Sequence, residues 1–276
     1  MCKKIWTLFK MEIARIWHDE NSIASIIFLP LLLPFAIFMV TLAGEEYLQV
    51  AITEPLPHSL NVALGSIYGI GIALCIFYAC NCFSAQIFSR PRHSGELYPL
   101  LGSSTGRTSM ALTKLGTVCL HVVFMALILG VGFVLGFHYI YSAEADNLRL
   151  TLGEGLGACA VILSLGLLVA TGTCLISALA GSKSAAGEVK SVLTVMLPFV
   201  PLAPILANMT SEPAFQIMPF FNTGSCLYDI WMKQVSYENI LITCAVNLFC
   251  ALILGYFVCR AFHKPNTMLS TIPEEA

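Results

Sequence analysis

The feature that most constrains this fold is a series of long apolar runs. Each run has about 20 residues, which is enough for a helix to cross a hydrocarbon core of roughly 30 Å. Hydrophobic residues make up 57% of the 276-residue chain and charged residues only 11%, against roughly 25% charged in a typical soluble domain. The sequence therefore predicts an all-α integral membrane protein with six transmembrane helices, over residues 23–43, 60–88, 115–141, 153–180, 191–209 and 239–259.

Basic residues are distributed unevenly between these spans. Apart from Arg149 and Lys233, every Lys and Arg falls in the N-terminal segment, the second-to-third connection, the fourth-to-fifth connection or the C-terminal tail. Lys and Arg accumulate in the cytoplasmic loops of membrane proteins. We therefore expect a multi-pass protein of the cytoplasmic membrane with both termini in the cytoplasm.

Residues 1–19 predict an amphipathic helix that lies in the membrane interface. Ile5, Ile13 and Ile16 share one helical face with three aromatic residues, and the other face is basic. Such helices bury their apolar face at the headgroup level. A helix packed on a soluble domain would show the same pattern, but the sequence predicts no soluble domain. The residues that define this interfacial helix are Trp6, Phe9, Lys10, Glu12, Arg15 and Trp17.

A polar interruption, residues 89–114, separates the second and third spans. Within it, the leucines of Gly95–Leu101 recur at helical spacing, which predicts a short amphipathic helix over residues 94–102. Basic residues around this segment would hold it near phospholipid headgroups. An ordinary solvated loop is the alternative. The basic residues are Arg90, Arg92, Arg107 and Lys114.

The connection before the last span, residues 210–238, is semi-apolar and carries Pro213 and Pro219. This composition favours short helices that dip back into the outer leaflet over a solvated loop. We therefore expect a re-entrant region here.

The sequence lacks the motifs of an enzyme. Residues 181–184, GSKS, imitate the end of a P-loop, but Ile176 stands where the first glycine is required. No His, Cys or carboxylate set has metal-ligand spacing, and no catalytic constellation can be assembled. We expect no catalytic residue, no metal site, no bound cofactor and no nucleic-acid partner.

The predicted spans carry no ionisable residue near their centres and show no internal inverted repeat, which disfavours a proton-coupled secondary transporter. Uncharged polar residues remain inside them. These either bridge helices or line a substrate pathway, and they are Asn81, Ser84, Gln86, Thr171, Thr173 and Asn247.

Three motifs in order give a family resemblance. Lys10-x-Glu12-x-x-Arg15 leads into a Leu-Pro helix, a Gly-x-Leu-x-x-Leu-Leu segment follows the second span, and Pro-x-x-Asn precedes the last span. The chain thereby resembles the membrane subunits of ABC-2 type exporters. It departs from them in having basic residues before the second motif and no proline after its paired leucines. The matching residues beyond the first motif are Leu29, Pro30, Gly95, Leu97, Leu100, Leu101, Arg107, Lys114, Pro219 and Asn222.

The resemblance implies a half-transporter. Two copies, or one copy and a paralogue, would form the pore, and two separate ATPase subunits would bind ATP and Mg beneath it. It further implies that a coupling helix contacts the ATPase together with the interfacial helix, through Gly95, Glu96, Leu97, Leu100, Leu101 and Arg107. The substrate would be lipophilic, drug-like or a peptide. A sodium-extruding permease, and a membrane assembly or receptor protein without transport, are the alternatives.

Overall fold

The structure is a computed structural model that describes residues 2–24, 26–27, 58–96, 106–140, 150–180, 183–200 and 213–263. Within these ranges every regular element is a helix, as the sequence predicts. The elements are α1 (Cys2–Trp17), α4 (His58–Ser84), the π-helical η1 (Ala85–Ser89), α5 (Arg90–His93), α7 (Arg107–Ile140), α8 (Leu152–Leu179), α9 (Lys183–Met196), the 3-10 helix η3 (Leu197–Phe199), α11 (Pro213–Ile217), α12 (Phe221–Trp231) and α13 (Tyr237–His263).

Four of the described helices are long and apolar enough to cross a membrane. They correspond to the second, third, fourth and sixth predicted spans. Most of the first predicted span, 23–43, and residues 201–209 of the fifth lie outside the described residues, so the count of six stays a prediction. The four segments are Tyr68–Arg92, Arg107–His138, Leu152–Leu179 and Tyr237–His263.

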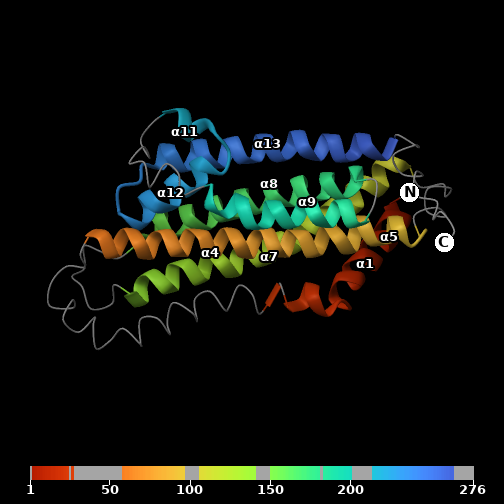
Figure 1. The fold of residues 1–276 in the computed structure, drawn as a ribbon, viewed down its shortest axis with the longest axis horizontal. Coiled ribbons are helices and arrows are strands. Elements are labelled where there is room, and N and C mark those ends of the chain that lie inside the picture. The colour runs from red at the N-terminus through yellow and green to blue at the C-terminus, as the bar shows by residue number, and fades with distance from the viewer. Residues whose placement is uncertain are drawn as a thin grey trace.

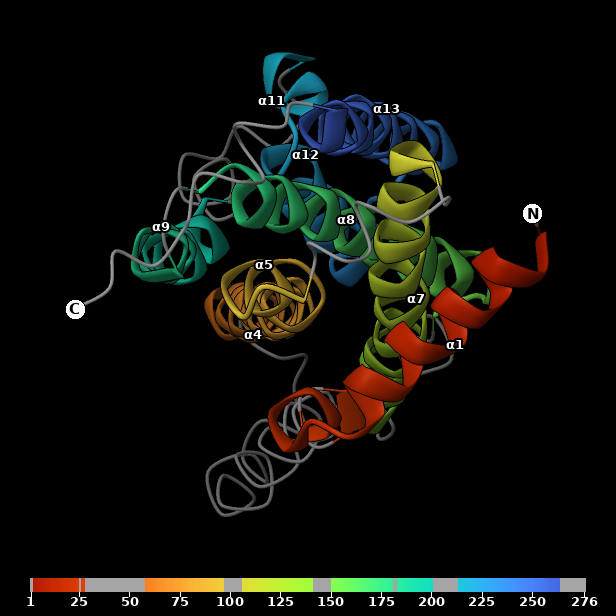
Figure 2. The same cartoon turned by 90° about the vertical axis from the view of Figure 1, so that its right-hand side faces the viewer.

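The long helices form one bundle, and different short elements lie at its two ends. Helices α4, α7, α8 and α13 run side by side, and α9 lies beside α4 and α8 (Figure 1). Helix α1 crosses α7 obliquely at one end of the bundle (Figure 2). The short helices α11 and α12 lie at the opposite end (Figure 1), in the region where the sequence predicts short helices.

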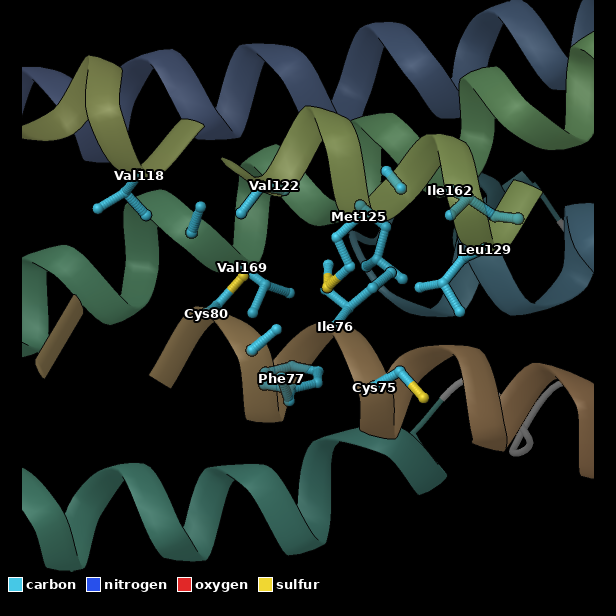
Figure 3. Close-up of a cluster of buried hydrophobic side chains, with 14 of the residues drawn as sticks. Cys75, Ile76, Phe77, Cys80, Val118, Val122, Met125, Leu129, Ile162 and Val169 are labelled. Atoms are coloured by element: carbon cyan, nitrogen blue, oxygen red, sulfur yellow. The ribbon is translucent and has the colours of Figure 1, made fainter. Parts of the chain in front are cut away.

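Helix α8 is the centre of this bundle, because it packs against α4, α7 and α13. A helix in that position must be apolar on nearly every face. Figure 3 shows the core at its middle, where side chains of α4, α7 and α8 point toward one another. Ile76, Phe77, Val122, Met125 and Val169 are all buried there.

Glycines in two helices lie where a neighbouring aromatic side chain approaches the backbone closely. A Cβ atom at Gly136 would overlap the Tyr68 hydroxyl, which donates a hydrogen bond to the Gly132 carbonyl at 3.1 Å. A Cβ atom at Gly65 would lie 3.0 Å from an indole of α12. By contrast, Gly69 has no atom within 4 Å of that position. Gly65 and Gly136 therefore serve close packing.

Two helices begin earlier in the chain than the sequence predicts. Helix α7 begins at Arg107 and not at 115, and α9 begins at Lys183 and not at 191. As a result Arg107, Lys114 and Lys190, which we assigned to loops, are helical residues. The assignment was wrong because two of these charges, Lys114 and Lys190, have buried polar partners within the bundle.

Candidate functional site

Helix α1 presents two different faces at its end of the bundle. Leu8, Glu12 and Ile16 recur every four residues and are buried. Trp6 and Trp17 lie elsewhere on the helix and are 56% and 45% exposed. The single apolar face predicted from the sequence is thus divided: its inner row contains an acid, and its tryptophans remain on the surface, as an interfacial helix requires.

A buried ion pair fastens α1 to the bundle. The Lys114 ammonium lies 2.5 Å from a Glu12 carboxylate oxygen, and neither side chain is exposed. The same ammonium donates a hydrogen bond to the Ile87 carbonyl of η1 at 2.8 Å. The second carboxylate oxygen of Glu12 lies 3.9 Å from Arg15 Nε. One cation therefore joins α1, η1 and α7.

A second ion pair connects α1 to the segment that follows α5. Arg15 Nη2 lies 2.5 Å from Glu96 Oε2, and the two side chains are 23% and 49% exposed. Burial alone would raise the pKa of Glu96. The charge of Arg15 and hydrogen bonds from Ser94 and Arg15 outweigh this effect, so the pKa lies below its ordinary value. Because the pair is exposed, solvent and salt screen it.

This outer pair borders a polar recess of about 470 Å³ between α1, η1 and α5. The recess contains both acids and bases and opens to the surface. It is lined by Met11, Ala14, Arg15, His18, Asp19, Gln86, Arg90 and Glu96.

The predicted coupling helix does not begin at residue 94. The Ser94 N–H bonds back to the Arg90 carbonyl at 2.9 Å and closes α5. Gly95 follows with φ of 78°, a left-handed conformation that suits glycine after a helix. The chain thus turns at Gly95 and places Glu96 against α1. Leu97, Leu100 and Leu101 lie outside the described residues.

Arg92 has a structural position that the sequence did not predict. Its side chain is 2% exposed and donates hydrogen bonds to the carbonyls of Ala178 and Ala180, at 3.0 and 2.6 Å. These carbonyls end α8, where a helix is electronegative. Arg92 therefore fastens α5 to α8, whereas the exposed Arg90 donates to Gln86 at 3.1 Å.

Helix α9 is joined to its neighbours by polar contacts. The buried Lys190 ammonium lies 3.0 Å from the Ser177 hydroxyl and 3.4 Å from the Ser84 hydroxyl. Asn81 donates to the Lys190 carbonyl and to the Thr194 hydroxyl. Two of the predicted pathway residues, Asn81 and Ser84, thus bridge α4 to α9.

The other predicted pathway residues are dispersed through the bundle. The Thr173 hydroxyl bonds to carbonyls of its own helix and of Cys80 in α4. Thr171 bonds within α8 and lines an apolar groove, and Gln86 faces the polar recess. The described helices therefore do not gather these side chains on one surface.

Asn222 and Asn247 come together where α12 packs against the middle of α13. Asn247 of α13 donates hydrogen bonds to Ser164 of α8 at 3.1 Å and to Thr223 of α12 at 2.8 Å. The Thr223 hydroxyl in turn donates to the Asn222 side-chain carbonyl at 3.2 Å. All four side chains are buried, and Pro219 lies half-buried before them. This neutral network holds the predicted re-entrant region against two long helices.

No protein-family model and no curated protein matches the chain. Among the described residues, no three His, Cys, Asp or Glu side chains are grouped as metal ligands would be. The geometry of the α1 end and the sequence motifs are therefore the features that bear on the function of the chain.

Proposed function

We propose that this chain is the permease subunit of an ABC-2 type exporter, powered by a separate ATPase. Two copies, or one copy and a paralogue, form the translocation pathway in the cytoplasmic membrane. The ATPase, in two copies, binds ATP and Mg. The observation that supports this most is the ion pair between Arg15 of α1 and Glu96 at the start of the coupling segment.

That ion pair matters because α1 and the coupling segment, the two segments expected to contact the ATPase, are joined to each other and to the bundle. Glu12 and Lys114 connect α1 to η1 and α7, and Arg92 connects α5 to α8. A displacement at this end is thus passed to three long helices through buried contacts. Such a displacement couples to nucleotide if the ATPase binds ATP better in one arrangement of the helices than in another.

The polar side chains of the bundle favour a lipophilic, drug-like or peptide substrate over sodium. A dehydrated cation needs several oxygen ligands. In the described helices, Asn81, Ser84 and Asn247 bond to different neighbours, and they do not come together as one set of oxygen ligands. Stimulation of ATPase activity by a panel of peptides, drugs and sodium in proteoliposomes would measure this preference.

Co-purification tests the proposal. The full-length chain, isolated from its native membrane in mild detergent, is expected to carry a P-loop ATPase with vanadate-sensitive activity. Leu97→Asp with Leu100→Asp should release the ATPase and abolish transport, because apolar contacts to the ATPase are lost. The matched control, Ser103→Asp with Ser104→Asp, adds the same charge to the same connection and should retain both.

Two results would contradict the proposal. In one, the wild-type chain carries no ATPase. In the other, the leucine variant keeps the ATPase and transports as before. A membrane assembly or receptor protein would instead hold a partner without any change of the helices on addition of nucleotide, which cysteine cross-linking between α4 and α9 would detect.

A further inference from the structure

We propose that a groove between α7, α8 and α13 binds one anionic phospholipid, in the leaflet on the α1 side of the molecule. The groove has a volume of about 490 Å³, within the roughly 300–1,000 Å³ of typical small-molecule sites. Large apolar side chains form its walls, among them Leu112 and Leu115 of α7, Leu167 of α8, and Leu248 and Leu252 of α13.

The hollow exists because α13 has a glycine where its neighbours approach. A Cβ atom at Gly255 would already lie 3.4 Å from Leu115 Cδ2 and 4.0 Å from Thr171 Cγ2. Any side chain larger than methyl would therefore project into the groove or push its walls apart. Exposed leucines on either side, Leu112 and Leu252, are 55% and 74% accessible, so the groove opens to its surroundings.

Beyond the apolar walls of the groove, the same helix carries a basic residue. Leu248, Leu252 and Tyr256 form a row with a spacing of four residues, and the next member of that row is Arg260 in the last turn of α13. Arg260 is exposed, and no ion pair joins it to an acid in the part of the chain that the structure describes. One turn further, His263 Nε2 lies 2.8 Å from the Thr108 hydroxyl, which also lines the groove.

The dimensions and charge together identify the occupant. From Leu248 to Arg260 the helix rises about 18 Å at 1.5 Å per residue, close to half of a hydrocarbon core of roughly 30 Å. An acyl chain of one leaflet thus spans the apolar row while its phosphate reaches the guanidinium. Arg is suited to phosphate, and basic residues at such openings select anionic headgroups.

Native mass spectrometry tests the site with defined lipids. The full-length chain in mild detergent is incubated with phosphatidylglycerol, or with phosphatidylcholine that has the same acyl chains. The wild type should retain one phosphatidylglycerol per chain, about fivefold in preference to phosphatidylcholine. Arg260→Gln should abolish the preference, whereas Arg90→Gln, an equal loss of exposed charge outside the groove, should leave it unchanged.

A second pair of variants tests the groove itself. Gly255→Leu should fill the hollow and remove both lipids. Cys250→Leu places the same leucine side chain five residues earlier, about 140° around the same helix, and should retain them. Equal retention of the two lipids by the wild type, or equal effects of the two Arg variants, would overturn the site. So would lipid retention by Gly255→Leu together with a change from dimer to monomer, which would mean that a second copy covers the groove.

These measurements do not involve an ATPase. If the lipid site fails, the proposed export function is unaffected, and if no ATPase associates with the chain, the lipid site is still open to test. Since Arg260 is exposed and forms no ion pair with the described residues, the charge variant remains informative even where Gly255→Leu does not fold.

Discussion

Glu12 and Lys114 form an ion pair that solvent does not reach. Removing two ions from water costs several kcal/mol for each, and their attraction offsets this only when the geometry is good and other hydrogen bonds are present. Here the ammonium has the Ile87 carbonyl as a further acceptor. The pair is therefore a contact that fixes where α1 docks, and its loss on one side only would leave a buried charge.

A double-mutant cycle tests this at the two residues. Lys114→Met and Glu12→Leu should each lower the free energy of unfolding by about 3–5 kcal/mol, because each leaves an uncompensated charge. The double variant should regain most of that loss, since both charges are gone. Thermal unfolding of the chain in detergent measures all three. Additive losses would show that the two side chains do not depend on each other.

At the scale of the helices, long apolar runs made the second, third, fourth and sixth spans predictable, because nothing but a helix can satisfy so many backbone groups in lipid. The first turns of α7 and α9 were not predictable from hydropathy. Lys114 resembles a loop residue until Glu12 is seen beside it, 102 residues away in the chain. Lys190 was misassigned for the same reason, since its serine partners lie on α4 and α8.

The site was only partly predictable. The sequence motif identified Glu12, Arg15 and Glu96, which the structure brings together, but not that the first of them is buried against Lys114. A signal for the turn at Gly95 was present, because glycine just past a short helix is a common C-terminal cap. Arg92 gave no such signal, since its acceptors are main-chain carbonyls of a distant helix.

Comparison of Arg92 with Arg90 provides a test at the scale of the elements. If Arg92 fastens α5 to α8, Arg92→Leu should destabilise the chain by about 1.5–3 kcal/mol, the range for hydrogen bonds of a charged group. Arg90→Leu removes an exposed side chain and should change stability by less than about 0.5 kcal/mol. Both are measured by thermal unfolding. Equal effects would mean that both arginines face headgroups, as the sequence alone predicts.

Across the whole molecule, an ion pair holds each end of the bundle. Lys233 Nζ lies 2.6 Å from Glu154 Oε2 at the end away from α1, and Lys114 pairs with Glu12 at the α1 end. At the end away from α1, the Trp231 ring also makes tilted or edge-on contacts with Tyr68, Phe133 and Phe137. At the α1 end, charged pairs join a peripheral helix to the bundle. The α1 end differs in that its ion pairs hold a peripheral helix, which agrees with the docking role that we propose for it.

The exposed pair Arg15–Glu96 makes the docking of α1 dependent on pH and salt. The folded pKa of Glu96 lies below its ordinary value of 4.5, so the charged form is favoured in the folded state. Its contribution is therefore complete above pH 4.5 and is lost as the pH falls through the lowered value. Since the pair is exposed, the contribution should be less than about 1 kcal/mol.

Hydrogen exchange of α1 peptides measures this contribution. In the wild type, protection of α1 should decrease below pH 4.5 and in high salt, beyond the intrinsic change in exchange rate. Glu96→Gln should show the weaker protection under all conditions, with no such dependence. Protection that responds to pH and salt equally in both proteins would assign the dependence to another group.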